Sequence, residues 1–194
     1  MSHDLRITKG NETKERILVA SMTIIAEEGI EGLSAKKIAD LLGISKSNIF
    51  HHFGSVDSIL DTIFEHILVD LVEPVKTYQG KDLEGFFLFL GESIYSLSDE
   101  ERLSYSVLFH FYNTCLHNEK YRDYLLKAKH EIVDAIATQL SHYSTQEKER
   151  LFKISEMIIM TLDGYGLHSL LESDVVTFKE IWTLQIKAWQ SLLK

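Results

Sequence analysis

Apolar residues recur along most of the chain at the spacing of α-helices. From Asn11 onward they stand three and four positions apart, which places them on one face of a helix that Gly29 ends. Residues 1–10 lack this pattern, and we expect them to form a mobile arm. The sequence therefore predicts a first helix over residues 11–28.

Two short helices and one long helix are predicted next. Ser34, Ser45 and Ser55 are good N-cap residues, and an apolar stripe follows each of them. Gly43 ends the helix after Ser34 within two turns, and Pro74 marks the end of the long helix after Ser55. Two short helices joined by a tight turn with glycine form a helix-turn-helix.

The polar residues of the second short helix are expected to be exposed. Ile44, Ile49 and Phe53 are spaced to pack into the angle between the two short helices. This packing leaves an outward edge of four polar residues: Lys46, Ser47, Asn48 and His51.

The pattern in the remainder of the chain predicts five more helices. Short segments separate them, and the last of these segments is residues 172–174. These helices cover residues 82–97, 100–116, 119–142, 146–171 and 175–193. We therefore predict an all-α fold. A three-helix head, residues 1–54, is joined by the long helix to a larger helical domain, residues 55–194.

Charge and cysteine content narrow the class of protein. Residues 1–53 hold equal numbers of basic and acidic side chains, so the whole net charge of −9 arises after them. An acidic body would repel DNA and leave the head as the docking face. The single cysteine, Cys115, excludes an internal disulfide and fits a reducing compartment. With no secretory signal and no membrane-spanning run, we expect a cytoplasmic protein.

Catalytic and metal-binding motifs are absent from the sequence. The nine histidines form no HExxH pattern, and one cysteine cannot anchor a zinc site. No P-loop, GxGxxG or GxSxG pattern occurs. We therefore expect no enzyme activity, no cofactor and no metal.

The head resembles the DNA-binding domain of TetR-family transcriptional regulators over residues 12–60, about a quarter of the chain. The residues that carry the resemblance are Thr13–Leu18, Gly29, Leu33-Ser34, Ile38-Ala39, Leu42–Ser45, Ile49-Phe50, His52-Phe53, Ser55 and Ile59-Leu60. The larger domain resembles the family only in its layout and in Leu162-Asp163-Gly164.

The resemblance implies a ligand-responsive transcriptional regulator. It would be a homodimer that binds palindromic double-stranded operator DNA at half-sites ~34–36 Å apart. A small-molecule effector in the larger domain would release the DNA, as in a repressor. Three alternatives stay open: an activator, an all-helical small-molecule-binding protein, or an enzyme with a degenerate head. The sequence identifies neither the effector, nor the operator and target genes, nor whether one or two dimers occupy each site.

For such a regulator, Lys46 and Asn48 are the expected base-reading residues, because they match the donor patterns of guanine and adenine. Phosphate contacts are expected from Ser34, Ser47 and His51, and the expected DNA-binding surface also includes Lys36, Lys37, Ser45 and Phe50. For Ser34 and Ser45 an N-cap role is an equal alternative, and for Lys36 a solvated charge. Phe50 replaces the tyrosine commonest in the family, and Gly54 and Val56 replace its lysine pair. These losses predict modest affinity with a shallow salt dependence.

The larger domain offers a candidate pocket and a candidate dimer interface. Aromatic residues are dense between residues 86 and 112, and some of them are expected to line an apolar cavity for a hydrophobic or aromatic ligand. The predicted pocket residues are Phe87, Phe109, Phe111, Tyr112, Cys115, Met157, Met160 and Thr161. The predicted interface, half of an intermolecular four-helix bundle, comprises Ile158, Leu162, Tyr165, Phe178, Trp182, Gln185 and Trp189.

Overall fold

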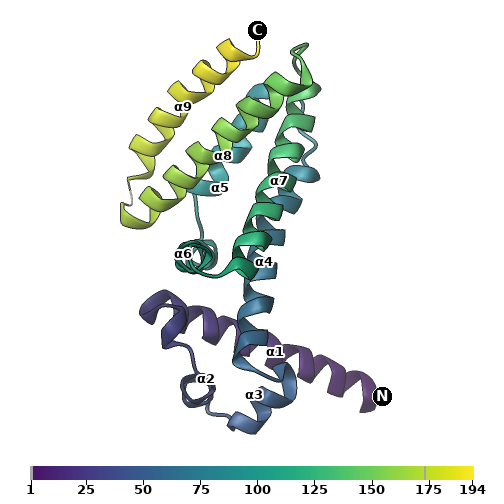
Figure 1. Ribbon diagram of the computed structural model, residues 1–194, viewed down its shortest axis with the longest axis vertical. Helices are drawn as coiled ribbons and strands as arrows, with labels where there is room; N and C mark the ends of the chain where they lie inside the picture. Colours follow the sequence, from purple (N-terminus) through teal and green to yellow (C-terminus); the bar gives the residue numbers. More distant parts are fainter. Residues whose placement is uncertain (1, 173) are drawn as a thin grey trace.

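The computed structural model describes residues 2–172 and 174–194, with side chains from Asn11 onward, and every regular element in this part is a helix (Figure 1). The all-α prediction is confirmed. The elements are α1 (Ser2–Glu28), the 3-10 turn η1 (Ile30–Gly32), α2 (Ala35–Leu42), α3 (Lys46–Phe53), α4 (Val56–Lys76), α5 (Leu83–Tyr95), α6 (Asp99–Cys115), α7 (Glu119–Ser141), α8 (Lys148–Leu171) and α9 (Val175–Leu192). Met1, and Ser173 in the predicted last separator, lie outside the described residues.

Two predicted boundaries are wrong. The arm predicted at residues 1–10 is helical from Ser2, because α1 continues through it without a break. The fourth helix does not end at Pro74 but runs to Lys76. Proline lacks an N–H and so removes one intrahelical hydrogen bond, but this loss falls in the last turn. The amide of Thr77 still reaches the carbonyl of Glu73 at 3.0 Å, which completes that turn.

The head owes its shape to side-chain caps and one left-handed glycine. Ser34, Ser45 and Ser55 each accept a hydrogen bond from a backbone amide in the first turn of the following helix, as predicted. Gly43 has φ 66° and ψ 32°, a conformation that costs a residue with a β-carbon about 1–2 kcal/mol. The chain can therefore turn sharply between α2 and α3, which lie at the lower end of the molecule in Figure 1.

Helix α4 connects the head to the body. Its first half packs Ile59, Ile63 and Phe64 into the core of the head, and Val75 near its end packs into the core of the body. In Figure 1 it rises from the head alongside α7. The division predicted between residues 54 and 55 remains a prediction, although the core of the head extends along α4 to Leu68.

Helix α6 lies at the junction between the head and the body, where Figure 1 shows it nearly end-on above α1. Its residues Val107, Phe111 and Cys115 belong to the same core cluster as α1 and the first half of α4. The ring of Phe111 stacks on Phe64 with 4.4 Å between centroids. Any movement of α6 is therefore felt by the head.

The body packs α5, α7, α8 and α9 around a second core. Trp182 and Trp189 of α9 are each 1% exposed and lie edge to face, with 5.1 Å between ring centroids. The indole N–H of Trp182 donates to the carbonyl of Phe87 on α5 at 2.8 Å. Among the described residues, no helix is both long and apolar enough to cross a membrane.

Candidate nucleic-acid interface and interior cavity

The outer edge of α3 presents the polar side chains that the sequence predicts there. Lys46, Ser47, Asn48 and His51 are exposed, whereas Ile49 between them is fully buried and holds α3 against the head. Phe50 is 44% exposed on the same helix. The structure therefore brings the predicted base-reading pair together on one accessible edge, and their contact with bases remains a prediction.

The two cap serines can serve two purposes at once. The Ser34 hydroxyl accepts a hydrogen bond from the Lys37 amide at 3.3 Å, and the Ser45 hydroxyl accepts one from the Asn48 amide at 3.2 Å. The Ser45 and Ser47 hydroxyl oxygens lie 2.9 Å apart. A hydroxyl that accepts through a lone pair keeps its proton to donate. The N-cap role is observed, and it leaves a phosphate contact possible.

The basic side chains of α2 differ in their surroundings. Lys36 and Lys37 are both exposed, and the ammonium of Lys37 is paired with Glu28 at the end of α1. A phosphate at Lys37 would have to compete with this carboxylate. An exposed pair of this kind is worth only about 0–1 kcal/mol, so the competition is weak.

In the last turn of α3, His52 is half-buried, unlike the exposed His51 beside it. The ammonium of Lys14 lies 5.8 Å from the centroid of the Phe53 ring. Burial, with smaller contributions from the positive charges of His51 and Lys14, lowers the pKa of His52. His52 is therefore neutral at physiological pH, as a packing residue should be.

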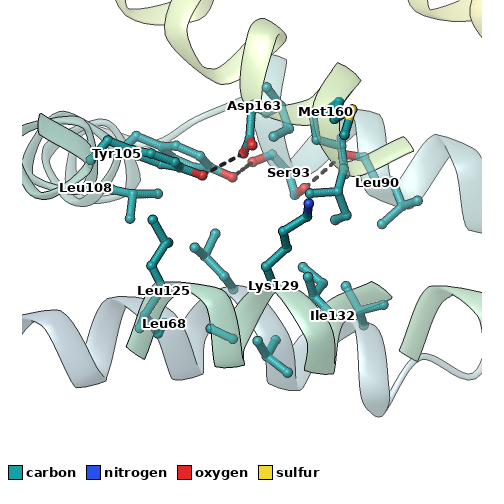
Figure 2. A pocket seen from close by; sticks show the side chains of 18 of the residues that line it. Leu68, Leu90, Ser93, Tyr105, Leu108, Leu125, Lys129, Ile132, Met160 and Asp163 are labelled. Atoms are coloured by element: carbon teal, nitrogen blue, oxygen red, sulfur yellow. Dashed lines mark hydrogen bonds between the residues drawn. The ribbon is translucent and has the colours of Figure 1, made fainter. Parts of the chain in front are cut away.

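An apolar cavity of about 310 Å³ lies in the body, between α4, α5, α6, α7 and α8 (Figure 2). Its volume is at the small end of the range for ligand pockets. Aliphatic side chains from all five helices line it, including Leu68, Leu90, Leu108, Leu125, Ile132 and Met160.

Polar groups gather on one side of this cavity. The Tyr112 hydroxyl donates to Oδ1 of Asp163 at 3.1 Å, and the Tyr105 hydroxyl donates to the carbonyl of Ser93 at 3.5 Å. The Lys129 ammonium, from α7, lies 4.0 Å from Oε1 of Glu156. Figure 2 shows Asp163 on the same side of the cavity as Tyr105, across from Leu125 and Leu68.

The pKa of Asp163 is raised although Tyr112 donates a hydrogen bond to its carboxylate. The side chain of Asp163 is exposed and lines the edge of the cavity, close to Tyr112 of α6. Desolvation by the surrounding protein raises the pKa of Asp163, and the hydrogen bond from Tyr112 and the charge of Lys129 only partly oppose the shift. Burial also raises the pKa values of Tyr105 and Tyr112, so both are neutral hydroxyl donors.

The predicted pocket residues are divided among several places. Tyr112 and Met160 line the cavity, and Phe109 stacks on Tyr112 with 5.6 Å between centroids. Phe87, Phe111 and Cys115 are buried in the two cores instead. Met157 is an exposed residue of α8, and Thr161 lines a surface groove between α8 and α9.

Sequence reasoning missed most of the polar lining of the cavity. Lys129 and Asp163 each stand within a helix beside apolar residues, such as Ile132 and Leu162, that line the same cavity. In the sequence, the available signal was a charged residue beside the apolar stripe of its helix, which can indicate a polar group in a cavity. Which helices meet around that charge is not visible in the sequence.

The predicted dimer interface needs correction. Ile158, Leu162, Trp182 and Trp189 are buried in the core of the same chain, so they are not available to a partner. Tyr165, Phe178 and Gln185 do line the groove between α8 and α9. The exposed apolar side chains of these two helices are Met157, Met160, Leu167, Leu171, Val175, Val176, Ile181 and Leu184. The spacing of the tryptophans marked an apolar stripe, but this stripe faces inward.

Comparison with known proteins agrees with this geometry. Residues 17–63 match the model of the bacterial regulatory proteins, tetR family. A transcriptional regulator of the helix-turn-helix type from the dhlA 5' region of Xanthobacter autotrophicus is 23% identical over 90% of this chain and 89% of its own.

Two solved structures share the fold. Salmonella enterica GusR superposes with a TM-score of 0.76 at 16% identity, covering 94% of this chain and 95% of its own. A transcriptional regulator from Saccharomonospora viridis in complex with choline superposes with a TM-score of 0.73 at 21% identity, covering 91% and 96%. Residues 17–63 are thus similar to the DNA-binding domain of the tetR family of bacterial regulatory proteins, and the whole chain shares its fold with these solved transcriptional regulators.

Proposed function

We propose that this regulator is a homodimeric repressor that binds a palindromic operator and is released from it by a small apolar effector. Residues 1–54 would bind DNA, and residues 55–194 would bind the effector and form the dimer. The observation that carries the DNA-binding part is the exposed edge of α3, where Lys46 and Asn48 stand free above the buried Ile49. A short helix with this arrangement fits the major groove.

The proposal of a dimer is supported by the surface of α8 and α9. Leu184 is 65% exposed and Met160 is 61% exposed, and Met160 and Ile181 line the groove that Tyr165 and Gln185 also line. Neighbouring exposed apolar side chains on two adjacent helices mark an interaction surface. A second copy of the same surface would complete a four-helix bundle and hold two heads at a fixed separation.

The proposal of an effector is supported by the cavity and by its position next to α6. One face of α6 lines the cavity with Tyr105, Leu108 and Tyr112. Another face packs Val107 and Phe111 into the core of the head. A molecule that fills the cavity and displaces α6 would therefore change the position of the head. The Saccharomonospora viridis regulator of the same fold holds choline, which supports a small organic effector for this fold.

The test is selection of bound fragments from the source genome. Wild type would be compared with a Lys46→Ala/Asn48→Ala double variant, and with a Lys127→Ala/Asn113→Ala control that removes the same residue types from exposed positions on α7 and α6. We expect wild type and the control to enrich one palindromic site, and the double variant to enrich none. Equal enrichment by the double variant would refute the proposed reading edge. Failure of all three would favour a helical binding protein with a degenerate head.

A further inference from the structure

The charge around the cavity is unbalanced, and among the described residues no lysine or arginine forms an ion pair with Asp163 in its polar corner. Among the described residues, Tyr112 is the only hydrogen-bond donor to the Asp163 carboxylate. Lys129 lies in the same lining, but its ammonium is directed to Glu156 at 4.0 Å. These three charged side chains together carry one net negative charge. A carboxylate that burial already disfavours gains from any cation that approaches it.

A second cavity beside the first carries the same sign of charge more strongly. It has a volume of about 740 Å³ between α4, α5 and α6, and it shares Tyr105, Leu108 and Ser93 with the first cavity as a common wall. Its charged lining residues are all acidic: Asp70, Glu73, Glu100 and Glu101. Lys76 pairs with Glu73 at 3.3 Å and reduces this charge only in part. Clustered carboxylates of one sign raise the local concentration of cations.

We propose that the effector of this regulator is a hydrophobic organic cation. Its ammonium group would lie at Asp163, next to the Tyr105 and Tyr112 hydroxyls, and its apolar body would occupy the aliphatic part of the cavity. The acidic second cavity concentrates such cations at the wall that both cavities share. This inference rests on the proposed function, since it names the chemical class of that effector.

The shape of the cavity agrees with this division of a ligand into two parts. Leu68, Leu125 and Ile132 line the side opposite Asp163 in Figure 2 and present no polar atoms from their side chains. A cationic head at that side would lose its hydration without a carboxylate to compensate. A head at Asp163 keeps a carboxylate partner, and the electron-rich rings of two tyrosines stand close to it.

An organic acid is the competing class, because it could pair with Lys129. Three probes with the same apolar chain separate the two classes: n-octyltrimethylammonium, 1-octanol and octanoate, which have cationic, neutral and anionic heads. Binding to the full-length protein is measured by isothermal titration calorimetry below the concentration at which the probes form micelles. The proteins are wild type, Asp163→Asn, Lys129→Met and an Asp123→Asn control, whose carboxylate is exposed on α7 away from both cavities.

We expect the cationic probe to bind wild type at least about tenfold more tightly than either other probe, because only a cationic head gains the Coulomb attraction of the Asp163 carboxylate. Asp163→Asn should remove that advantage, while Lys129→Met and Asp123→Asn should keep it. The side-chain amide that Asp163→Asn introduces still accepts the Tyr112 hydrogen bond through its oxygen, so the fold should persist, which circular dichroism would verify.

The remaining outcomes overturn the inference in distinguishable ways. If octanoate binds most tightly and Lys129→Met abolishes this, the effector class is wrong, although the proposed regulator stands if octanoate releases DNA. Equal binding of the three probes, or no binding of the cation, refutes the role of Asp163. If the cation binds through Asp163 but leaves operator binding unchanged, the ligand class is upheld and the release step of the proposed function fails.

Discussion

The close contact between α5 and α9 predicts that Gly91→Ala will destabilise the protein. A β-carbon at Gly91 would lie 2.5 Å from Cδ1 of Trp182 and closer still to Nε1, well inside van der Waals contact. The indole ring of Trp182 must therefore move. That movement breaks the 2.8 Å hydrogen bond that its N–H donates to the Phe87 carbonyl.

The expected loss follows from three contributions. Overpacking of a core costs about 1–3 kcal/mol. A buried donor without a partner costs about 1–3 kcal/mol. Alanine stabilises a helix interior by about 0.5–1 kcal/mol relative to glycine, which offsets part of the loss. The midpoints of these ranges give a net decrease of about 3 kcal/mol in the free energy of unfolding, or about 6–12 °C in Tm for a chain of this length.

Urea unfolding followed by tryptophan fluorescence measures this loss, because Trp182 and Trp189 are the two tryptophans of the chain. The matched control is Gly164→Ala in α8, where a β-carbon would meet nothing within 4 Å. That control should be as stable as wild type or slightly more so. If Gly91→Ala were equally stable, Trp182 would not pack against α5, and the tryptophan stripe of α9 would again be a candidate surface for a partner.

Three further predictions concern the DNA-binding edge, the dimer and the cavity. Phe50→Tyr should tighten operator binding by about 0.5–1.5 kcal/mol in fluorescence anisotropy, because it adds one hydroxyl for a phosphate; unchanged affinity would place Phe50 away from the backbone. Leu184→Asp should yield folded monomers by light scattering, whereas Trp189→Asp should destabilise the chain by about 3–5 kcal/mol; a folded Trp189→Asp monomer would contradict this. Burial raises the pKa of Asp163 in the folded protein above its ordinary value of 3.8, so the folded state binds the carboxyl proton more tightly than the unfolded state does. The stability gained from this proton is complete below pH 3.8 and is lost as the pH rises through the folded pKa. Wild type should therefore lose stability relative to Asp163→Asn over that interval in urea titrations, and a constant difference would refute the shift.

Local physical chemistry allowed the helices and the reading edge to be predicted. A serine that caps a helix and a glycine that permits a left-handed turn act on their immediate neighbours, so Ser34, Gly43 and Ser45 mark where the two helices begin and where the turn lies. The exposed polar edge follows, because Ile49 must point inward at this spacing. The rule that proline ends a helix failed at Pro74. The cost of a proline depends on its position in the helix, and Pro74 lies in the last turn of α4.

Which helices meet was decided only in the tertiary structure. Periodicity shows that α9 has an apolar stripe, but a stripe that packs on its own core and a stripe that meets a partner have the same sequence pattern. Contact of Trp182 with Gly91 and Phe87, far away in the chain, makes it a core residue. The cavity is likewise a product of five helices, and the sequence cannot place Asp163 beside Tyr112 because burial and hydrogen bonding arise only from that meeting.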